Sequence, residues 1–229
     1  MFPPGFEVPA APFKSVPRGG ERLQVASDPP VQIRPPTGAS SEPPSAGVAA
    51  SVVLDDLAIQ RALMRIAHEI VERNDELDRL YLVGIPNGGV PLARQIALNL
   101  REIAGVDVTL GVLDTTLYRD DRVTSGIRPR LRHTEMPSAV DGRLVILVDD
   151  VASTGRTVRA AMDALMDFGR PRAVQVVALV DRGHRELPIK IDYVGKNIPT
   201  QRTDHVELRT GPAGGDMEVV LMQSRGAPS

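Results

Sequence analysis

One run of the sequence combines the residue types that a sugar phosphate needs. In Leu144 to Thr157 (LVILVDDVASTGRT), an apolar stretch leads to two carboxylates, Asp149 and Asp150, and a short turn containing Gly155 follows. A helix that starts after this turn offers unpaired N–H groups and the positive end of its dipole to a phosphate. Carboxylates repel phosphate, but they accept hydrogen bonds from a ribose diol and bind the magnesium that accompanies a diphosphate. The run therefore predicts a ribose 5-phosphate site.

The same residues also have a plainer interpretation as a helix cap and a turn. The hydroxyl groups of Ser153, Thr154 and Thr157 favour the phosphate interpretation because they add hydrogen-bond donors. The run is not a P-loop, because no lysine follows the glycine, and it lacks the G-x-G-x-x-G spacing of a dinucleotide site.

Apolar periodicity predicts the elements that hold this run in place. The predicted helices are Asp56 to Arg73, a helix opened by Gly88-Gly89, and Val158 to Phe168. The predicted strands are Leu80 to Ile85, Val106 to Leu113, Leu144 to Val148 and Val174 to Val180. This alternation indicates an α/β fold with a mainly parallel central sheet flanked by helices, in which ligands bind beyond the carboxyl ends of the strands. The polar stretch Arg119 to Val140 is long for a loop, which is typical of a functional or mobile segment.

The composition limits the classes of protein to consider. The formal net charge is −2, so binding of nucleic acid would need a local basic patch. The chain has no cysteine, which excludes disulfides and thiolate metal sites. No apolar run approaches the roughly 20 residues of a membrane span, and no secretion signal is present. We expect a cytoplasmic protein without membrane contact.

The two ends of the chain differ from its middle. Residues 1–50 hold more than half of the 20 prolines, and proline prevents helices and sheets from propagating. We expect a disordered proline-rich tail there, with docking of a partner as an open alternative. We expect residues 211–229 to form a strand at Met217 to Met222 and then a tail.

Four segments carry a resemblance to a known family: VILVDDVASTGRT, TLYRDD (Thr116 to Asp121), DALMDFGRP (Asp163 to Pro171) and ALVDRGHRELPIKIDYVGKNIPT (Ala178 to Thr200). The first resembles the signature of type I phosphoribosyltransferases for 5-phosphoribosyl-1-pyrophosphate (PRPP). Together they resemble the PyrR regulators of pyrimidine operons over roughly Leu54 to Leu208. The resemblance implies a phosphoribosyltransferase domain over residues 51–210, with the type I fold and a mobile hood loop.

The resemblance also implies an activity and partners. The implied reaction is uracil plus PRPP giving UMP plus diphosphate, with Mg2+ as cofactor. The family binds the leader mRNA of pyrimidine (pyr) genes in response to UMP and forms dimers and tetramers. Candidate arginines for RNA are Arg61, Arg65, Arg73 and those between Arg182 and Arg202.

The resemblance assigns roles to individual residues. Asp149 and Asp150 contact the ribose hydroxyls and are the candidate magnesium ligands. Arg119 lies near the hood, where it meets pyrophosphate, and uracil is read around Asp181 and Arg182. The residues implied to bind PRPP or UMP are Asn87, Gly88 and Gly89 in the pyrophosphate loop, and Val151, Ala152, Ser153, Thr154, Gly155, Arg156 and Thr157 after the carboxylates.

Two positions depart from the family pattern. The pyrophosphate loop reads Pro86-Asn87-Gly88, where the family carries a cation, and Ala152-Ser153 stands where it has leucine and an aromatic residue. Loss of a charge-assisted contact costs about 1.5–3 kcal/mol. A catalytically weak domain that senses PRPP or UMP is therefore a second hypothesis.

Overall fold

The computed structural model describes residues 48–86, 88–118, 134–211 and 215–224. Its helices are α1 (Asp56–Arg73), α2 (Gly89–Ala104) and α3 (Arg156–Leu165). Its strands are β1 (Val48–Leu54), β2 (Leu80–Gly84), β3 (Thr109–Val112), β4 (Leu144–Ala152), β5 (Ala173–Asp181), β6 (Tyr193–Asn197), β7 (His205–Thr210) and β8 (Met217–Ser224). Short 3-10 turns cover Leu77–Arg79, Thr116–Tyr118 and Met166–Phe168. No described helix is long and apolar enough to cross a membrane.

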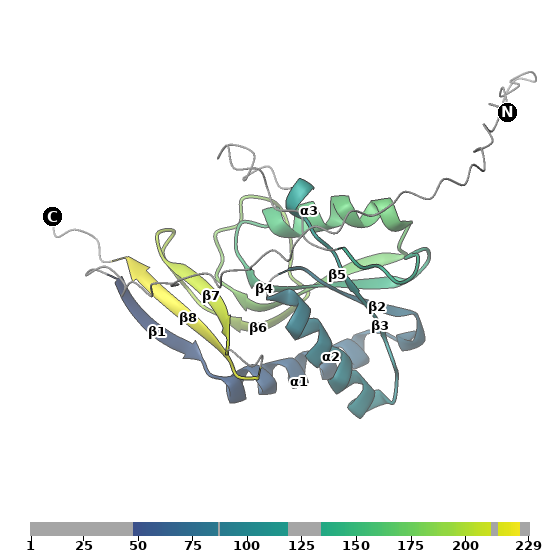
Figure 1. Ribbon diagram of the computed structural model, residues 1–229, viewed down its shortest axis with the longest axis horizontal. Helices are drawn as coiled ribbons and strands as arrows, with labels where there is room; N and C mark the ends of the chain where they lie inside the picture. Colours follow the sequence, from purple (N-terminus) through teal and green to yellow (C-terminus); the bar gives the residue numbers. More distant parts are fainter. Residues whose placement is uncertain (1–47, 87, 119–133, 212–214, 225–229) are drawn as a thin grey trace, which may run out of the picture. The chain divides into compact units, whose positions relative to one another are not determined.

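The central sheet has the strand order β3-β2-β4-β5-β6, and every pair of neighbours in it is parallel (Figure 1). The parallel sheet predicted from the sequence is therefore confirmed. From β2 the chain moves outward to β3 and then returns to place β4 on the other side of β2. This reversal makes the carboxyl ends of β2 and β4 a topological switch point, where α/β proteins bind ligands.

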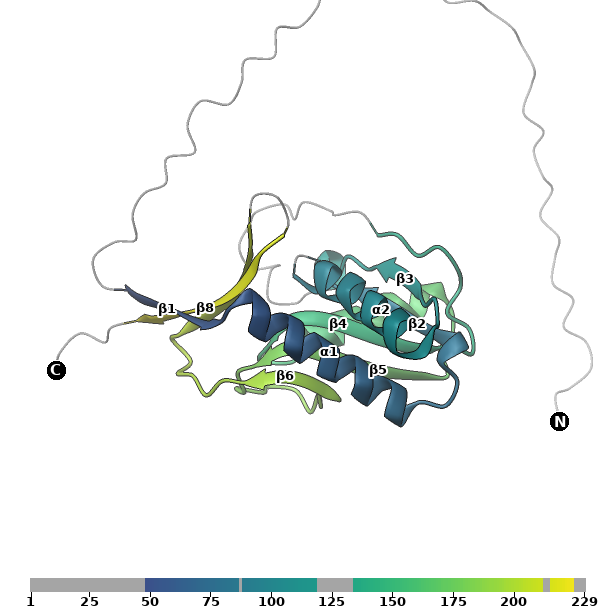
Figure 2. The same cartoon turned by 90° about the horizontal axis from the view of Figure 1, so that it is seen from below.

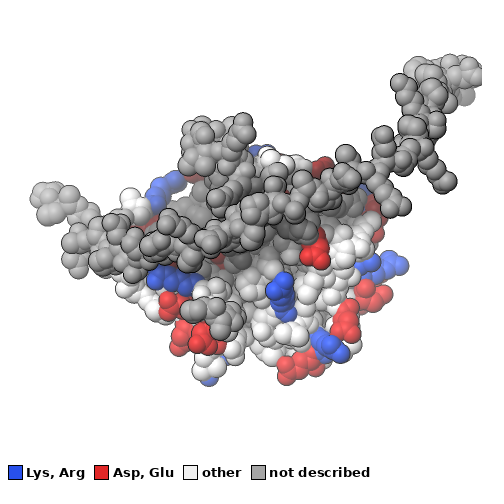
Figure 3. Space-filling view, in the orientation of Figure 1, with Lys and Arg blue, Asp and Glu red and all other residues white. Residues whose placement is uncertain are grey.

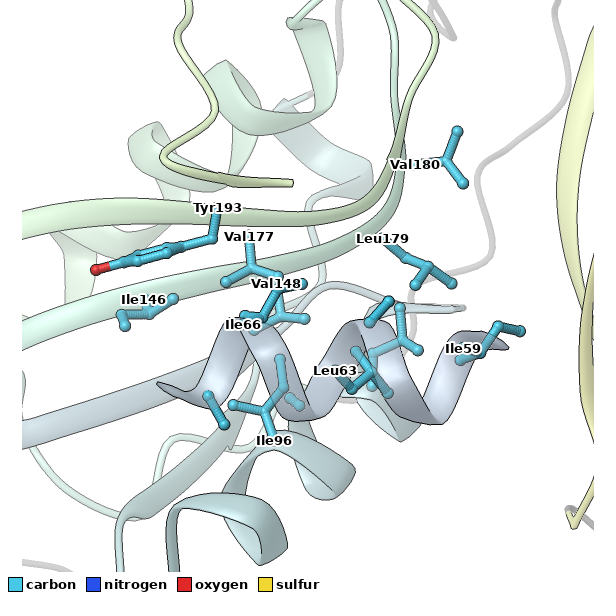
Figure 4. Close-up of a cluster of buried hydrophobic side chains, with 14 of the residues drawn as sticks. Ile59, Leu63, Ile66, Ile96, Ile146, Val148, Val177, Leu179, Val180 and Tyr193 are labelled. Carbon is cyan, nitrogen blue, oxygen red and sulfur yellow. The ribbon is translucent and has the colours of Figure 1, made fainter. Parts of the chain in front are cut away.

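Helices cover both faces of this sheet. Figure 1 shows α1 and α2 on one face and α3 on the other, and Figure 2 shows the face that carries α1 and α2. The predicted apolar stripe of α1 includes Ile59, Leu63 and Ile66, which are fully buried and pack with Val148 of β4 (Figure 4). On the opposite face, Leu147 belongs to the cluster that α3 covers. Burial on both faces explains why the strand residues of LVILV are continuously apolar.

The boundaries around the carboxylates differ from those predicted. We expected the strand to end at Val148, but β4 continues to Ala152, because β5 runs beside it and pairs Ala152 with Asp181. Asp149 and Asp150 therefore lie within the strand. Helix α3 begins at Arg156, two residues before the predicted start, and the last predicted turn is a 3-10 turn.

A three-stranded antiparallel sheet, with the order β1-β8-β7, joins the two ends of the described chain. The predicted C-terminal strand is present as β8, but β1 and β7 were not predicted. Val48 to Ala50, which we assigned to the disordered tail, are strand residues because they pair with Met222 to Ser224. The first described strand therefore begins at Val48, within the segment that we expected to be tail.

A buried polar network lies near the amino ends of the central strands. The Tyr193 hydroxyl donates to Oε1 of Gln175 at 2.9 Å and accepts from Nδ2 of Asn74 at 3.0 Å. Tyr193 is 1% exposed, and this burial raises the pKa of its hydroxyl. Tyr193 is therefore a packing residue whose polar end is hydrogen-bonded.

Candidate active site

The two aspartates of β4 are held by local backbone contacts. Asp149 is buried, and its Oδ1 accepts a hydrogen bond from the Asp150 N–H at 3.1 Å. Oδ1 of Asp150 accepts from the Val151 N–H at 2.9 Å. These bonds fix both carboxylates at the carboxyl end of the strand, where ribose hydroxyls could donate to their oxygen atoms.

The loop between β2 and α2 packs directly against these carboxylates. The Ile85 N–H donates to Val148 O at 2.9 Å, which ties the loop to β4. A Cβ atom on Gly89 would lie 2.0 Å from Val148 O, and one on Gly88 would lie 2.3 Å from Oδ2 of Asp150. Both glycines are therefore required for space, and two loops that are far apart in the sequence meet at the switch point. Asn87 lies outside the described residues.

The turn after β4 has the geometry of an anion site. Gly155 has a φ of 91°, a left-handed conformation that favours glycine, and it precedes the first residue of α3. Its hypothetical Cβ would lie 3.1 Å from Cβ of Ile189. The Thr154 hydroxyl accepts from the Arg156 N–H at 3.3 Å. The turn therefore lies at the N-terminus of α3, the end of a helix that favours an anion.

A cavity of about 290 Å³ lies beside this turn. Eight of the predicted site residues line it: Asp149, Val151, Ala152, Ser153, Thr154, Gly155, Thr157 and Arg182. Val158, His205 and Val206 complete the lining. The contribution of β7 was missed although HVELRT alternates polar and apolar residues, because nothing local to that strand indicates that His205 reaches the cavity.

The side chains of Arg156 and Asp181 make contacts within the protein. Nε of Arg156 pairs with Glu186 at 2.8 Å. Asp181 accepts from the Gly183 N–H through Oδ1 at 2.9 Å and from Arg185 through Oδ2 at 2.6 Å. The Asp181 carboxylate therefore holds a loop in place.

Arg182 and His184 are anchored to the segment before β7. The Arg182 guanidinium donates from Nε to Oγ1 of Thr200 at 3.1 Å and from Nη2 to Gln201 O at 2.8 Å. His184 has a φ of 63°, and its Nε2 lies 2.8 Å from Thr200 O. These contacts assign His184 a structural role.

The predicted hood follows Tyr118, the last residue described before position 134. Arg119 lies outside the described residues. The Tyr118 hydroxyl donates a hydrogen bond to Asp167, and this bond raises the pKa of Tyr118 above its usual range. The hydrogen bond connects Tyr118, which precedes the predicted hood, to the 3-10 turn after α3.

Comparison with known proteins agrees with this geometry. A hypoxanthine-guanine phosphoribosyltransferase from Bacillus anthracis superposes with a TM-score of 0.54 at 20% identity, over 65% of this chain and 84% of the other. A hypoxanthine phosphoribosyl transferase from Trypanosoma cruzi gives 0.54 at 22% identity, over 66% and 78%. The model of the phosphoribosyl transferase domain family matches residues 50–210. The fold and the site define a phosphoribosyltransferase domain of type I.

Relatives with higher sequence identity identify the family within the phosphoribosyltransferases. A protein of Pelotomaculum thermopropionicum named "Bifunctional protein PyrR" is 52% identical over 172 residues, which cover 75% of this chain and 95% of the relative. Its namesake from Thermus aquaticus is 52% identical over 169 residues, covering 74% and 93%. This chain belongs to the PyrR family.

Proposed function

We propose that this protein transfers the phosphoribosyl group of PRPP to uracil, giving UMP and diphosphate, and regulates pyrimidine genes by binding their leader RNA when UMP is bound. The observation that carries the enzymatic part is the meeting of three features at one switch point: two fixed carboxylates, a turn of anion-binding geometry and a glycine loop in contact with Asp150.

Each part of PRPP has a matching group in the site. Asp149 and Asp150 accept hydrogen bonds from the ribose hydroxyls, and the turn from Val151 to Thr157 holds the 5-phosphate with backbone N–H groups and hydroxyls. The loop at Gly88 offers its backbone to the diphosphate, because no side chain blocks the approach, whereas the Gly89 N–H donates to Ile85 O at 3.0 Å. Holding both ends of PRPP fixes C1 of the ribose for attack.

The residues present fit a magnesium ion that arrives with PRPP. Magnesium prefers oxygen ligands and keeps several waters or substrate oxygens, so it needs only one or two protein carboxylates. Asp149 and Asp150 supply these oxygens, and the described residues contain no larger acidic or histidine cluster that could hold a metal. Bound magnesium would neutralise charge on the diphosphate leaving group.

Uracil is read near the carboxyl end of β5 in this proposal. Because Gly183 and Arg185 occupy the two carboxylate oxygens of Asp181, recognition there falls to backbone groups and to neighbouring side chains. Arg182 and His205 line the same cavity as the phosphate turn and are the nearest such candidates.

The base preference is tested by incubating the protein with PRPP, magnesium and one base at a time. We expect UMP from uracil and no nucleotide from cytosine or hypoxanthine. Hypoxanthine is the informative control, because the fold is shared with hypoxanthine phosphoribosyltransferases. Faster turnover of hypoxanthine than of uracil would refute the assignment of uracil.

The proposed RNA surface combines two of the arginine groups identified in the sequence. Helix α1 packs against β6, and Nη2 of Arg65 donates to Gly195 O at 2.5 Å. Nη1 of Arg73 donates to Asp192 O at 2.9 Å. These bonds place the α1 arginines beside the segment between Arg182 and Arg202. On the face drawn in Figure 3, the visible basic and acidic side chains are interspersed.

A gel-shift titration with the protein's own pyr leader RNA tests this surface. We expect UMP to increase the affinity and Arg65→Gln to lower it, whereas Arg94→Gln on α2 is the exposed control that leaves it unchanged. An affinity independent of UMP would contradict the regulatory part. Light scattering after size-exclusion chromatography measures the oligomer, which we propose to be a dimer or a tetramer.

The second candidate function is a sensor of PRPP or UMP with little catalysis. It is favoured by one observation, the absence of a cation from Pro86-Asn87-Gly88. UMP binding measured by calorimetry, combined with no detectable UMP formation, would support the sensor and exclude the enzyme.

A further inference from the structure

Three consecutive carbonyl groups of the phosphate-binding turn are held by the segment that follows β5. Ala152 O accepts from the Arg182 N–H at 3.0 Å. Ser153 O accepts from Nη1 of Arg185 at 2.6 Å. Thr154 O accepts from the N–H groups of Glu186 and Leu187 at 3.0 and 3.2 Å. The carbonyl groups from Ala152 to Thr154 are thus all hydrogen-bonded to the segment after β5.

The hydrogen bonds to these three carbonyls also determine where the N–H groups of the turn point. In a planar trans peptide, the N–H points away from the C=O of the same unit. The three carbonyls point toward the segment after β5, so the following N–H groups, those of Ser153, Thr154 and Gly155, point away from it. Successive N–H groups turned to one side form an anion-binding nest. The segment after β5 therefore fixes the direction of the donors that meet a phosphate.

Among these contacts, the one to Ser153 O is the only one made by a side chain. The Arg185 guanidinium uses all of its nitrogen atoms, since Nη2 pairs with Asp181 at 2.6 Å and Nε donates to Ile189 O at 3.1 Å. The Arg185 side chain is 24% exposed and that of Asp181 is 17% exposed. A planar guanidinium holds three acceptors in fixed directions. The three donors of an ammonium group sit on one nitrogen atom and rotate, so they do not fix these directions.

The anchor of this arginine belongs to the central sheet. Asp181 is the last residue of β5 and is paired with Ala152 of β4. The Asp181 carboxylate is held a second time by the Gly183 N–H. The sheet thus sets the position of Asp181, Asp181 sets that of Arg185, and Arg185 sets that of the Ser153 peptide.

We propose that Arg185 is a positioning residue for binding of the 5-phosphate, acting through the Ser153 carbonyl without touching the substrate. The proposal rests on the proposed function, because it takes the ligand of the turn to be the 5-phosphate of PRPP or UMP. It gives Arg185 a role other than the RNA contact for which the sequence made the arginines between Arg182 and Arg202 candidates.

The test compares Arg185→Gln with Arg143→Gln. Arg143 is a matched control because its guanidinium also makes structural contacts, 3.0 Å to Oγ1 of Thr109 and 5.5 Å to the Tyr81 ring centre, but at the amino end of β4. In metal sites, loss of a residue that orients a ligand typically costs about 10- to 100-fold in affinity, and we take the same magnitude here. We therefore expect Arg185→Gln to raise the KM for PRPP and the Kd for UMP by this factor, with the KM for uracil unchanged. Arg185→Lys recovers part of the loss, and Arg143→Gln matches the unsubstituted protein.

A second measurement does not depend on activity. In ligand-free protein, Arg185→Gln is expected to accelerate hydrogen–deuterium exchange in residues 152–157, whereas Arg143→Gln leaves exchange there unchanged. Protein that binds UMP but forms none would refute the proposed catalysis, and the UMP affinities would still decide the role of Arg185. Equal UMP affinity and equal exchange in Arg185→Gln and unsubstituted protein would overturn the proposal. A parallel rise in the KM for uracil would also overturn it, because it would indicate general damage to the site.

Discussion

Replacement of Gly88 by alanine would place a methyl group against the side chain of Asp150. The added Cβ would lie 2.3 Å from Oδ2, 2.5 Å from Cγ and 2.6 Å from Cβ of Asp150. Gly88 has a φ of −80°, which any residue adopts, so the substitution introduces no backbone strain. Its effect comes from the collision alone, which displaces the Asp150 side chain or the loop that carries Gly88.

The size of the effect follows from these distances. Carbon atoms in contact prefer about 3.5–4.0 Å, whereas the new Cβ and Cγ of Asp150 would be 2.5 Å apart, so the two side chains must separate by about 1 Å. Overpacking of this kind costs about 1–3 kcal/mol of folding free energy. Moving the carboxylate from the ribose loses a charged hydrogen bond of about 1.5–3 kcal/mol, which is roughly a 10- to 100-fold loss of UMP affinity.

A double-mutant cycle identifies the collision as the cause. Asp150→Gly removes all three atoms that the new methyl group meets, so in that background Gly88→Ala should cost almost nothing. The coupling free energy, measured by urea denaturation, should be about 1–3 kcal/mol. Gly215→Ala is the control, because a Cβ there meets no atom within 4 Å. Additive effects of Gly88→Ala and Asp150→Gly would refute the reasoning.

Two further substitutions test the phosphate turn and the hydrogen-bond network of Tyr193. Gly155→Ala forces a φ of 91° on a residue with a side chain; we expect a loss of about 1–2 kcal/mol of stability together with weaker UMP binding, and unchanged UMP affinity would contradict the assigned role of the turn. Tyr193→Phe removes hydrogen bonds to the partly buried side chains of Gln175 and Asn74; we expect a loss of about 0.5–1.5 kcal/mol in thermal or urea unfolding, with UMP formation unchanged at a permissive temperature. A fall in turnover of fully folded Tyr193→Phe would show that this network reaches the active site.

The parts of the fold that were predicted correctly depend on local patterns. The stripe of Ile59, Leu63 and Ile66 marked α1 because each residue faces the same buried layer. The apolar run before Asp149 marked β4, since a strand covered on both faces has no polar side. The phosphate turn was predicted because its chemistry resides in neighbouring residues.

The second sheet was predicted only in part. β1 (VAASVVL) shows no alternation and directly follows a proline-rich stretch, so nothing local distinguishes it from the tail. It exists because it pairs with β8 across more than 150 residues, which leaves no local signal. β7 (HVELRT) forms a hairpin with β8 and alternates polar and apolar residues, a strand signal that our prediction did not use.

The candidate site was predicted in its residue types but not in its contacts. Asp181 was placed near uracil on the strength of its position in the family motif, whereas its carboxylate binds Gly183 and Arg185. Gly88 was chosen for its free amide, and its contact with Asp150 adds a second reason for a glycine. Each of these contacts joins loops at the strand ends, where only the assembled sheet determines which groups meet.

The central claim is that Asp149, at the switch point of the sheet, takes part in a phosphoribosyl transfer. It is tested most directly by measuring UMP formed from labelled uracil, PRPP and magnesium, with the unsubstituted protein and Asp149→Asn side by side. We expect steady formation of UMP by the unsubstituted protein and none by Asp149→Asn, with both proteins folded to the same extent. Equal turnover of the two proteins, or none by the unsubstituted protein under conditions in which it binds UMP, would contradict the claim.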